Sequence, residues 1–304
     1  MAKKRALISV AILVALSAVV GGYPLYRSVT DIGSMSGEPL GQQFARQDEL
    51  ARSYSIGVVS RFAPAIAYET YQPLIDYLNR VTPYTFRLRL SNSYEETVEQ
   101  LAAGEVIAAF LGSYIYVQVR NELPIRPLLR PLNRDGEPFT RSALIVRRGS
   151  PLRSIEDLAG RSLALPSPSS FSGNWVTRMA LREHGMSVDD LTDVQFFDYH
   201  HTVVFQVLWG QFDAGVVRES VAQEYLDKGI EVLASSPSFS GAPLVVHEEA
   251  NSALVGELEA ALLGIPASQS DQFSGDLASG FVRARSVDYD DLERLVNRMS
   301  KDHG

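Results

Sequence analysis

The sequence has 304 residues, of which 45% are apolar and 21% are charged, so it is long enough to bury one large or two smaller cores. The formal net charge is −8 and no basic cluster follows the first residues, which argues against nucleic acid as the main partner. Cysteine is absent, which excludes disulfides, thiol catalysis, thiolate metal sites and a lipid anchor on a leader cysteine.

The amino-terminal residues have the layout of an export signal. Three basic residues at positions 3–5 precede an apolar run over about 6–22. This run approaches the ~20 residues that span a bilayer, so residues 1–27 are predicted to be either a cleaved signal peptide or a retained membrane anchor. Basic residues before the apolar run predict export of the remainder in both cases. Residues 28–52, rich in glycine, are predicted to be a polar linker.

From Ser53 onward, strand-like and helix-like segments alternate, which is typical of α/β architecture. The predicted strands lie at 54–59, 86–90, 107–111, 142–147, 162–165, 194–197 and 214–217. Pro73 is suited to the first turn of a helix, and Ser93 with Glu96 forms a capping box at the start of another. Further helices are predicted between 154 and 160, from about 176 to a stop at 185, and over 202–209.

Ligands of open α/β sheets bind at the carboxyl ends of the strands, so the loops after the predicted strands are candidate sites. These loops lie at Ser60, Gly112, Ser169, His200 and Glu219. One of them has the sequence PSPSSFSGNW, at positions 166–175, before an amphipathic segment. Its serines favour a turn with a helix cap, and hydroxyls beside the free N–H groups of a helix start also favour an anion site.

Sequence motifs of enzymes are missing, because no G-x-S-x-G, H-E-x-x-H or G-x-x-x-x-G-K-[ST] pattern occurs. A triad of Ser170, His200 and Asp213 can be drawn, but a chain of this length offers many such triples, and a hydrolase is the minor alternative. His200 lies where a strand hands over to a helix, so it is either a cap or core residue or a donor to an anion. We predict no catalytic residue, no metal and no cofactor.

Five stretches, in order between about Tyr54 and Val296, together resemble the substrate-binding proteins of phosphate, phosphite and phosphonate uptake transporters. They are YETYQPLIDYLN, LAAGEVIAAFLGSYIYV, SALIVRRGSPLRSIEDLAGRSLALPSPSSFSGNW, DYHHTVVFQVLWGQFDAGVV and GFVRARSVDYDDLERLV. The resemblance implies a periplasmic binding protein type 2-like α/β fold, in which two lobes enclose a ligand cleft.

The resemblance also implies two hinge crossings between the lobes, near Leu144 and near Leu244. Lobe 1 would then comprise residues 53–143 plus 244–304, and lobe 2 would comprise residues 144–243.

The residues of the ligand site follow from the same resemblance. The serine-rich loop would meet an oxyanion through Ser170, Ser172 and Gly173. Phe171 stands where the family often has threonine, which suggests a ligand larger or less polar than phosphate. The family's other contacts would fall on His200, on Tyr116, on the first loop at Ser60 and Arg61, and on Glu219 or its neighbour Ser220, the position that meets an amino group in phosphonate binders.

We therefore predict a non-enzymatic extracytoplasmic solute-binding protein that captures a small phosphonate-, phosphite- or phosphate-like oxyanion for an ABC transporter by closing two lobes. Its expected partners are the small anionic ligand and the transporter permease, with membrane contact only through the amino-terminal segment. The alternative is a membrane-tethered sensor that feeds a signalling partner. The predicted location is the periplasm, in soluble form or tethered to the inner membrane.

Overall fold

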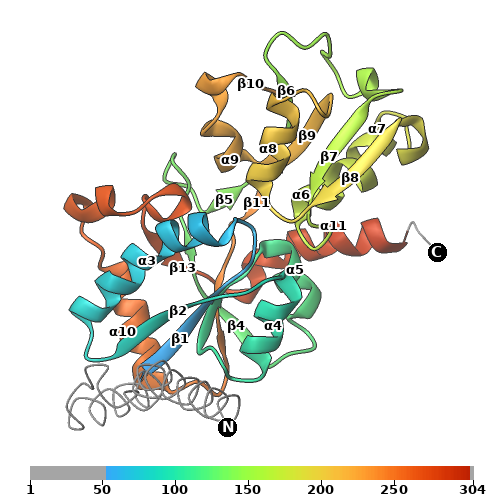
Figure 1. Ribbon diagram of the computed structural model, residues 1–304. Coiled ribbons are helices and arrows are strands. Elements are labelled where there is room, and N and C mark those ends of the chain that lie inside the picture. Colours follow the sequence, from blue (N-terminus) through green and yellow to red (C-terminus); the bar gives the residue numbers. More distant parts are fainter. Residues whose placement is uncertain (1–52, 302–304) are drawn as a thin grey trace, which may run out of the picture. The chain divides into compact units, whose positions relative to one another are not determined.

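Two β-sheets with flanking helices organise residues 53–301, the part of the chain that the computed structural model describes (Figure 1). The predicted leader or anchor over 1–27 and the predicted linker over 28–52 lie outside the described residues. Within 53–301, no helix combines the length and the apolar character that crossing a bilayer requires.

The first sheet has six strands in the order β13-β4-β12-β3-β1-β2. The strands are β1 (Ser53–Val58), β2 (Thr85–Leu90), β3 (Ala108–Phe110), β4 (Ile125–Pro131), β12 (Leu244–His247) and β13 (Phe281–Arg283). The helices that accompany them are α3 (Pro64–Val81), α4 (Tyr94–Ala102), α5 (Ser113–Val119), α10 (Ser252–Leu263) and α11 (Asp290–Lys301). β1 runs parallel to β2 and β3, whereas β12 and β13 are antiparallel to their neighbours.

The helix α3 begins at Pro64, so the prediction that Pro73 lies in a first helical turn is wrong. Pro64 takes the first-turn position, where a missing N–H breaks no helical bond. Pro73 lies inside the helix, where it cannot donate to the carbonyl of Glu69, an exposed residue whose backbone can turn to water instead. The apolar face predicted for this helix is buried, namely Tyr71, Leu74, Ile75 and Leu78.

The second sheet has five strands in the order β10-β6-β9-β7-β8. The strands are β6 (Ser142–Arg147), β7 (Ser162–Pro166), β8 (Asp193–Phe197), β9 (Ala214–Arg218) and β10 (Ile230–Ser235). The helical segments are α6 (Phe171–Trp175), a π-helical turn (Val176–Ala180), α7 (Leu181–Glu183), α8 (His200–Leu208) and α9 (Glu219–Gln223). The helix predicted between 154 and 160 is a single 3₁₀ turn, Glu156–Leu158. β7 is parallel to both of its neighbours, and β6 is antiparallel to β9 and β10.

Two short strands, β5 (Phe139–Thr140) and β11 (Phe239–Ser240), lie on the connections between the sheets and pair with each other. Leu144 lies inside β6 paired with Val216, and Leu244 begins β12, so both connections precede the positions given for the crossings. The assignment of the lobes by residue range stays a prediction.

The helix α11 packs against α5, and its buried side chains belong to an apolar cluster that also contains residues of the second half (Figure 1). Its side chains Leu292, Val296 and Met299 are buried in one cluster with Tyr116 of α5 and Leu181 of α7. The last helix is therefore part of the core that joins the two halves.

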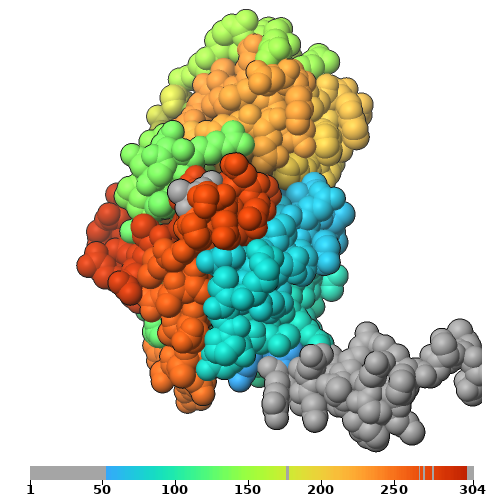
Figure 2. Space-filling view, turned by 90° about the vertical axis from the view of Figure 1, so that its left-hand side faces the viewer, coloured from blue at the N-terminus to red at the C-terminus, as the bar shows by residue number. Residues whose placement is uncertain are grey.

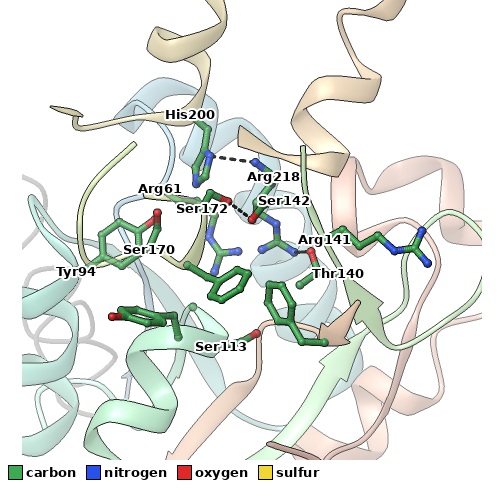
Figure 3. A pocket seen from close by; sticks show the side chains of 14 residues that line it. Arg61, Tyr94, Ser113, Thr140, Arg141, Ser142, Ser170, Ser172, His200 and Arg218 are labelled. Atoms are coloured by element: carbon green, nitrogen blue, oxygen red, sulfur yellow. Dashed lines mark hydrogen bonds between the residues drawn. The ribbon is translucent and has the colours of Figure 1, made fainter. Parts of the chain in front are cut away.

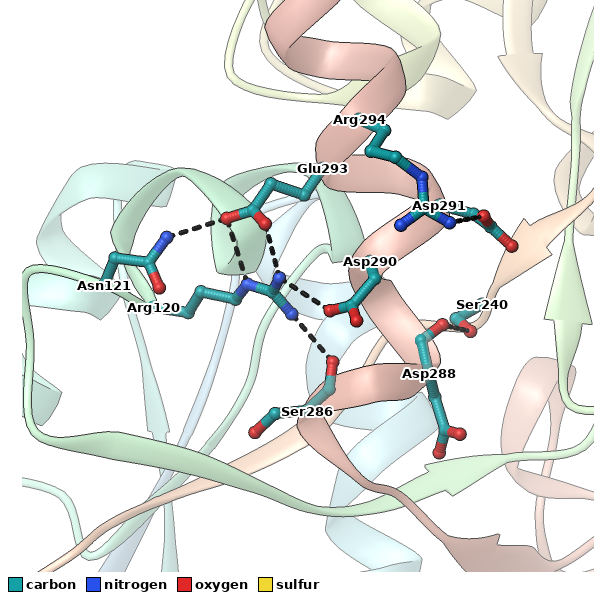
Figure 4. A network of polar contacts seen from close by, with 9 residues as sticks. All are labelled: Arg120, Asn121, Ser240, Ser286, Asp288, Asp290, Asp291, Glu293 and Arg294. Atoms are coloured by element: carbon teal, nitrogen blue, oxygen red, sulfur yellow. Dashed lines mark hydrogen bonds and ion pairs between the residues drawn. The ribbon is translucent and has the colours of Figure 1, made fainter.

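A polar cluster fixes α11 to the end of α5 (Figure 4). The guanidinium of Arg120 lies 2.6 Å from a carboxylate oxygen of Glu293 and 2.8 Å from one of Asp290. It also donates to the backbone carbonyl of Ser286 at 2.7 Å, and Asn121 donates to Glu293 at 2.7 Å. The Arg120 side chain is only 9% exposed, so these charged contacts are largely shielded from water.

Candidate functional site

A pocket with about 390 Å³ of empty space, part of it open to solvent, lies where the two sheets face each other (Figure 3). Its walls come from the loops after β1, β3 and β7, from the start of α4 and α8, and from the end of β9. These are carboxyl ends of strands, where open α/β sheets bind ligands. Across the described residues, no group of histidine and acidic side chains is arranged to hold a metal ion.

The guanidinium of Arg61 lies at the wall of this pocket. The residue is buried, with only 3% of its surface exposed. A tight turn ends β1, because the N–H of Arg61 donates to the carbonyl of Val59 at 2.8 Å. The guanidinium donates to the carbonyl of Leu111 at 3.2 Å, and its Nε has no hydrogen-bond partner among residues 53–301. Among the described side chains, no carboxylate forms an ion pair with it. A buried positive charge is costly without a counter-ion, so this position favours an anion.

Arg218, the last residue of β9, brings a second guanidinium to the pocket. It donates to the hydroxyl of Thr140 at 3.1 Å, and Figure 3 shows both guanidinium groups near the middle of the pocket. Arg141 also lines the wall, but its side chain points away and lies 3.9 Å from the carboxylate of Glu219. No acidic side chain is among the described residues that line the pocket, so its electrostatic character is positive.

His200, the first residue of α8, uses its two ring nitrogens differently. Nδ1 accepts a hydrogen bond from the backbone N–H of Arg218 at 3.2 Å. Burial, and next the positive charges of Arg218 and Arg61, hold the pKa of His200 well below its ordinary value. The ring is therefore neutral, and because Nδ1 accepts, Nε2 carries the proton and can donate into the pocket.

The serine-rich loop acts first as a structural cap. The hydroxyl of Ser170 accepts from the N–H of Gly173 at 3.0 Å and donates to the carbonyl of Ser167 at 2.9 Å. The donated bond uses the only proton of this hydroxyl. A Cβ at Gly173 would stand 2.3 Å from the carbonyl oxygen of Ser167 and 2.7 Å from that of Pro166. Glycine is therefore required for the close approach of two backbone segments.

Ser172 contributes to the pocket through a hydroxyl pair. Its Oγ lies 2.8 Å from the Oγ of Ser142 on β6, and both side chains are buried. One hydroxyl of the pair donates to the other, so one proton of the two is left over. The pair can therefore donate one hydrogen bond to a ligand.

Tyr94 supplies a phenol from the start of α4. The capping box predicted at Ser93 is half formed. The hydroxyl of Ser93 accepts from the N–H of Glu96 at 3.0 Å, but the carboxylate of Glu96 accepts from the N–H of Asn92 instead of that of Ser93. Burial raises the pKa of the Tyr94 phenol, and the charges of Arg61 and Arg218 offset only part of this effect. The phenol therefore keeps its proton and is a donor.

Three aromatic rings form an apolar wall of the same pocket. The ring of Phe171 lies 4.3 Å from that of Phe239 and 6.3 Å from that of Tyr114, measured between ring centres. Phe171 is 5% exposed and belongs to the buried core. The pocket thus combines hydrogen-bond donors and positive charge with an aromatic surface.

Five of the residues predicted to form the ligand site lie on this wall, namely Arg61, Ser170, Phe171, Ser172 and His200. Gly173 lies directly behind the loop and shapes it. Ser60 is not among the lining residues, because its hydroxyl donates to the carbonyl of Asn92 at 3.3 Å.

The structure does not bring Tyr116 and Glu219 to the pocket. Tyr116 is 1% exposed and packs edge to face on Tyr289 at 4.8 Å, because its position on α5 faces the core beside α11. Glu219 lies beyond Arg141 and lines a separate hollow with Asn133. Figure 2 shows the face of the molecule on which these lining residues lie, where the green segment after β4 meets the orange-red segment near residue 275.

The catalytic triad considered above is not assembled. Asp213 accepts hydrogen bonds from the backbone N–H and the hydroxyl of Ser162, both at 2.9 Å. Ser162 begins β7, whereas Ser170 follows the opposite end of this strand, and the Nδ1 of His200 is occupied by the N–H of Arg218.

Sequence reasoning missed several polar residues of the wall, among them Tyr94, Ser142 and Arg218. The signal for Arg218 was present, because it ends the buried run AGVVR directly before the loop already chosen as a candidate. Tyr94 and Ser142 read as ordinary residues of a helix and a strand, so only their neighbours in space identify them.

The fold and the site thus define an α/β binding protein with a positively charged pocket between two sheets. A family model described as "ABC transporter, phosphonate, periplasmic substrate-binding protein" matches residues 56–292, and the chain belongs to this family. This confirms the resemblance drawn from the sequence.

Individual relatives agree with this assignment. The chain is 26% identical over 171 residues to the "Phosphate-import protein PhnD" of Mycolicibacterium smegmatis, a match that covers 53% of each protein. The chain thus spans about half the length of this curated relative.

Two solved structures share the fold. A binding protein component of an ABC phosphonate transporter from Pseudomonas aeruginosa aligns with a TM-score of 0.74 at 16% identity, over 82% of this chain and 86% of that one. PhnD1 from Prochlorococcus marinus, in complex with methylphosphonate, aligns with a TM-score of 0.72 at 16% identity, over 82% and 99%. The prediction of a periplasmic binding protein fold is confirmed.

Proposed function

We propose that this protein captures a small phosphorus oxyanion in the pocket at Arg61 and delivers it to the permease of an ABC transporter. The observation that carries the proposal is the guanidinium of Arg61, which is buried, faces the pocket and has no carboxylate partner among the described side chains. Arg218, the Nε2–H of His200, the Tyr94 phenol and the hydroxyl pair of Ser142 and Ser172 surround the same space. The named relatives import phosphate or hold methylphosphonate, which supports this ligand class.

We propose further that the protein binds without chemistry and works outside the cytoplasm. Among the described residues, no carboxylate lines the pocket, and His200 on its wall is neutral and fixed by the backbone of Arg218. The two lobes of the proposal are residues 53–143 plus 244–304 and residues 144–243, joined near the β5–β11 pair. Amino-terminal sequencing of exported protein distinguishes a cleaved receptor from a tethered form, which the sensor alternative requires.

Thermal unfolding in phosphate-free buffer tests the anion site. Phosphate, phosphite or methylphosphonate is expected to raise the Tm of the wild-type protein, because a bound anion stabilises the folded state. In Arg61→Met, which keeps much of the side-chain volume, this rise is expected to vanish. The ligand-free Arg61→Met protein should be at least as stable as wild type, since an unpaired buried charge has been removed.

The matched control is Arg126→Met, because Arg126 is exposed on β4 and away from the pocket. This variant should respond to anions as the wild type does. The proposal fails if none of these oxyanions stabilises the wild-type protein, or if Arg61→Met is stabilised to the same extent.

A further inference from the structure

We propose that the pocket selects doubly charged oxyanions with an uncharged, apolar substituent and excludes ligands that carry an ammonium group. In this proposal, Phe171 contacts the substituent and determines the preference for an apolar one. This inference rests on the proposed capture of an oxyanion. It concerns the choice between an alkylphosphonate and an aminoalkylphosphonate, which share the same head group and differ in the charge of the tail.

The first step is the charge of the wall. Two guanidinium groups, from Arg61 and Arg218, face the pocket, and no acidic side chain lines it within the described residues. Charges interact strongly in such a partly dehydrated space, so two negative charges on the ligand match the wall better than one. A positive group on the ligand would be repelled by both arginines.

The second step is the position of the nearest acidic residues. Glu219 lies beside Arg141, 3.9 Å from its guanidinium, and faces a different hollow. Glu95 accepts a hydrogen bond from the hydroxyl of Ser169 and is not on the pocket wall. Neither carboxylate is therefore placed to pair with an ammonium group of a bound ligand.

The third step is the aromatic wall. Phe171 stands in the middle of the serine-rich loop, and its ring contacts Phe239 and lies near Tyr114. An alkyl group against these rings loses contact with water, which is favourable for the ligand. Aromatic faces also attract cations. Here the ring of Phe171 is packed between its two neighbours, and the two arginines oppose a cation.

Isothermal titration of the wild-type protein with a matched pair of ligands tests the inference at mildly alkaline pH, where phosphonate heads are doubly charged. Ethylphosphonate and aminomethylphosphonate have the same number of heavy atoms, with a methyl group in one and an ammonium group in the other. Ethylphosphonate is expected to bind at least tenfold more tightly, about 1.4 kcal/mol. Ethanesulfonate, which carries one charge, should also bind at least tenfold more weakly than ethylphosphonate.

Equal or tighter binding of aminomethylphosphonate or of ethanesulfonate overturns this inference and leaves the capture of oxyanions standing. Absence of binding for all of these ligands and for inorganic phosphate overturns the capture itself, so the two failures give different results.

The role of Phe171 is tested by Phe171→Ser, which removes the ring and adds a hydroxyl. The preference for ethylphosphonate over inorganic phosphate should fall about tenfold, whereas Phe196→Ser, at a phenylalanine that is 49% exposed, should leave it unchanged. An unchanged preference in folded Phe171→Ser removes this residue from the proposal. Should Phe171→Ser not fold, Phe171→Thr removes the ring and keeps one methyl group beside the hydroxyl, and the same ratio decides.

Discussion

The two ring nitrogens of His200 have different roles, because Nδ1 accepts from the backbone of Arg218 and Nε2 can donate into the pocket. These roles can be tested separately. In His200→Asn the amide oxygen can replace Nδ1 as acceptor for Arg218, but no donor reaches the pocket. This variant should keep its stability within about 1 kcal/mol and lose affinity for the anion, about tenfold. In His200→Gln the amide N–H can replace Nε2, but the buried N–H of Arg218 loses its acceptor, at a cost of about 1–2 kcal/mol.

Urea denaturation and titration with methylphosphonate, performed on both variants, measure the two effects separately. If both variants lose affinity and stability together, the separation of tasks between Nδ1 and Nε2 is wrong.

At the scale of residues, the sequence predicted the polar serine loop better than it predicted which charged side chains line the pocket. The serines at 166–175 predicted a helix cap and an anion site, because capping depends on neighbours in the chain, and the family resemblance then selected Ser170 and Ser172. The linear pattern could not show that the hydroxyl of Ser170 donates its proton to the carbonyl of Ser167. It also could not show that Arg61 and Arg218, far apart in sequence, face one pocket, because this depends on how two sheets meet.

At the scale of elements, the attachment of α11 to α5 depends on Arg120, whose side chain is 9% exposed. Arg120→Met keeps the apolar stem but leaves Glu293 and Asp290 without their shared cation. We expect a loss of about 2 kcal/mol in the free energy of unfolding, less than for a fully buried pair because both carboxylates are partly exposed. Arg89→Met breaks an exposed pair with Glu105 and should change stability by less than about 1 kcal/mol.

The same attachment predicts a pH dependence. The hydrogen bond from Arg120 is the main reason that the pKa of Glu293 lies below its ordinary value. A lowered folded-state pKa gives stability that is present above the unfolded value, about 4.3, and is lost as pH falls through the folded value. The difference in unfolding free energy between wild type and Arg120→Met should therefore shrink as pH falls below about 4. A difference that stays constant over this range would contradict the assignment.

Helices and strands were predictable where one regular spacing of apolar residues defines their buried face. The buried face of α3 was read correctly, whereas its start was not, because two prolines compete for the first turn and only Pro64 precedes the apolar face. The helix predicted from about 176 to a stop at Gly185 consists of a π-helical turn and α7, and α6 precedes it. An irregular turn of this kind leaves no mark in the spacing of apolar residues.

At the scale of the molecule, polar contacts join the two halves on either side of the pocket. The N–H of His200 donates to the carbonyl of Arg61 at 3.3 Å, and the hydroxyl of Ser169 donates to the carboxylate of Glu95. The sequence placed Ser169, His200 and the first loop in segments at the carboxyl ends of strands and Glu95 in the helix that follows Ser93, and the resemblance implied two halves. Which loops touch across the pocket depends on the three-dimensional packing alone.

Glu95 offers the clearest test of whether these contacts hold the pocket closed, because it touches Ser169 without lining the pocket. This hydrogen bond is the largest cause of the lowered pKa of Glu95, so the ionised carboxylate strengthens the contact. If closure over the ligand uses this contact, Glu95→Ala should weaken anion binding about threefold to tenfold, mainly by faster dissociation. Glu95→Gln keeps an acceptor without the charge and should recover most of the loss.

Stopped-flow measurement of methylphosphonate dissociation distinguishes this effect from a change in pocket charge. Removing a negative charge near two arginines would by itself tighten anion binding, in Glu95→Gln as much as in Glu95→Ala. Glu99→Ala, at an exposed position of the same helix, should dissociate like the wild type. Unchanged or slower dissociation in Glu95→Ala would show that the contact with Ser169 does not hold the two halves together around the ligand.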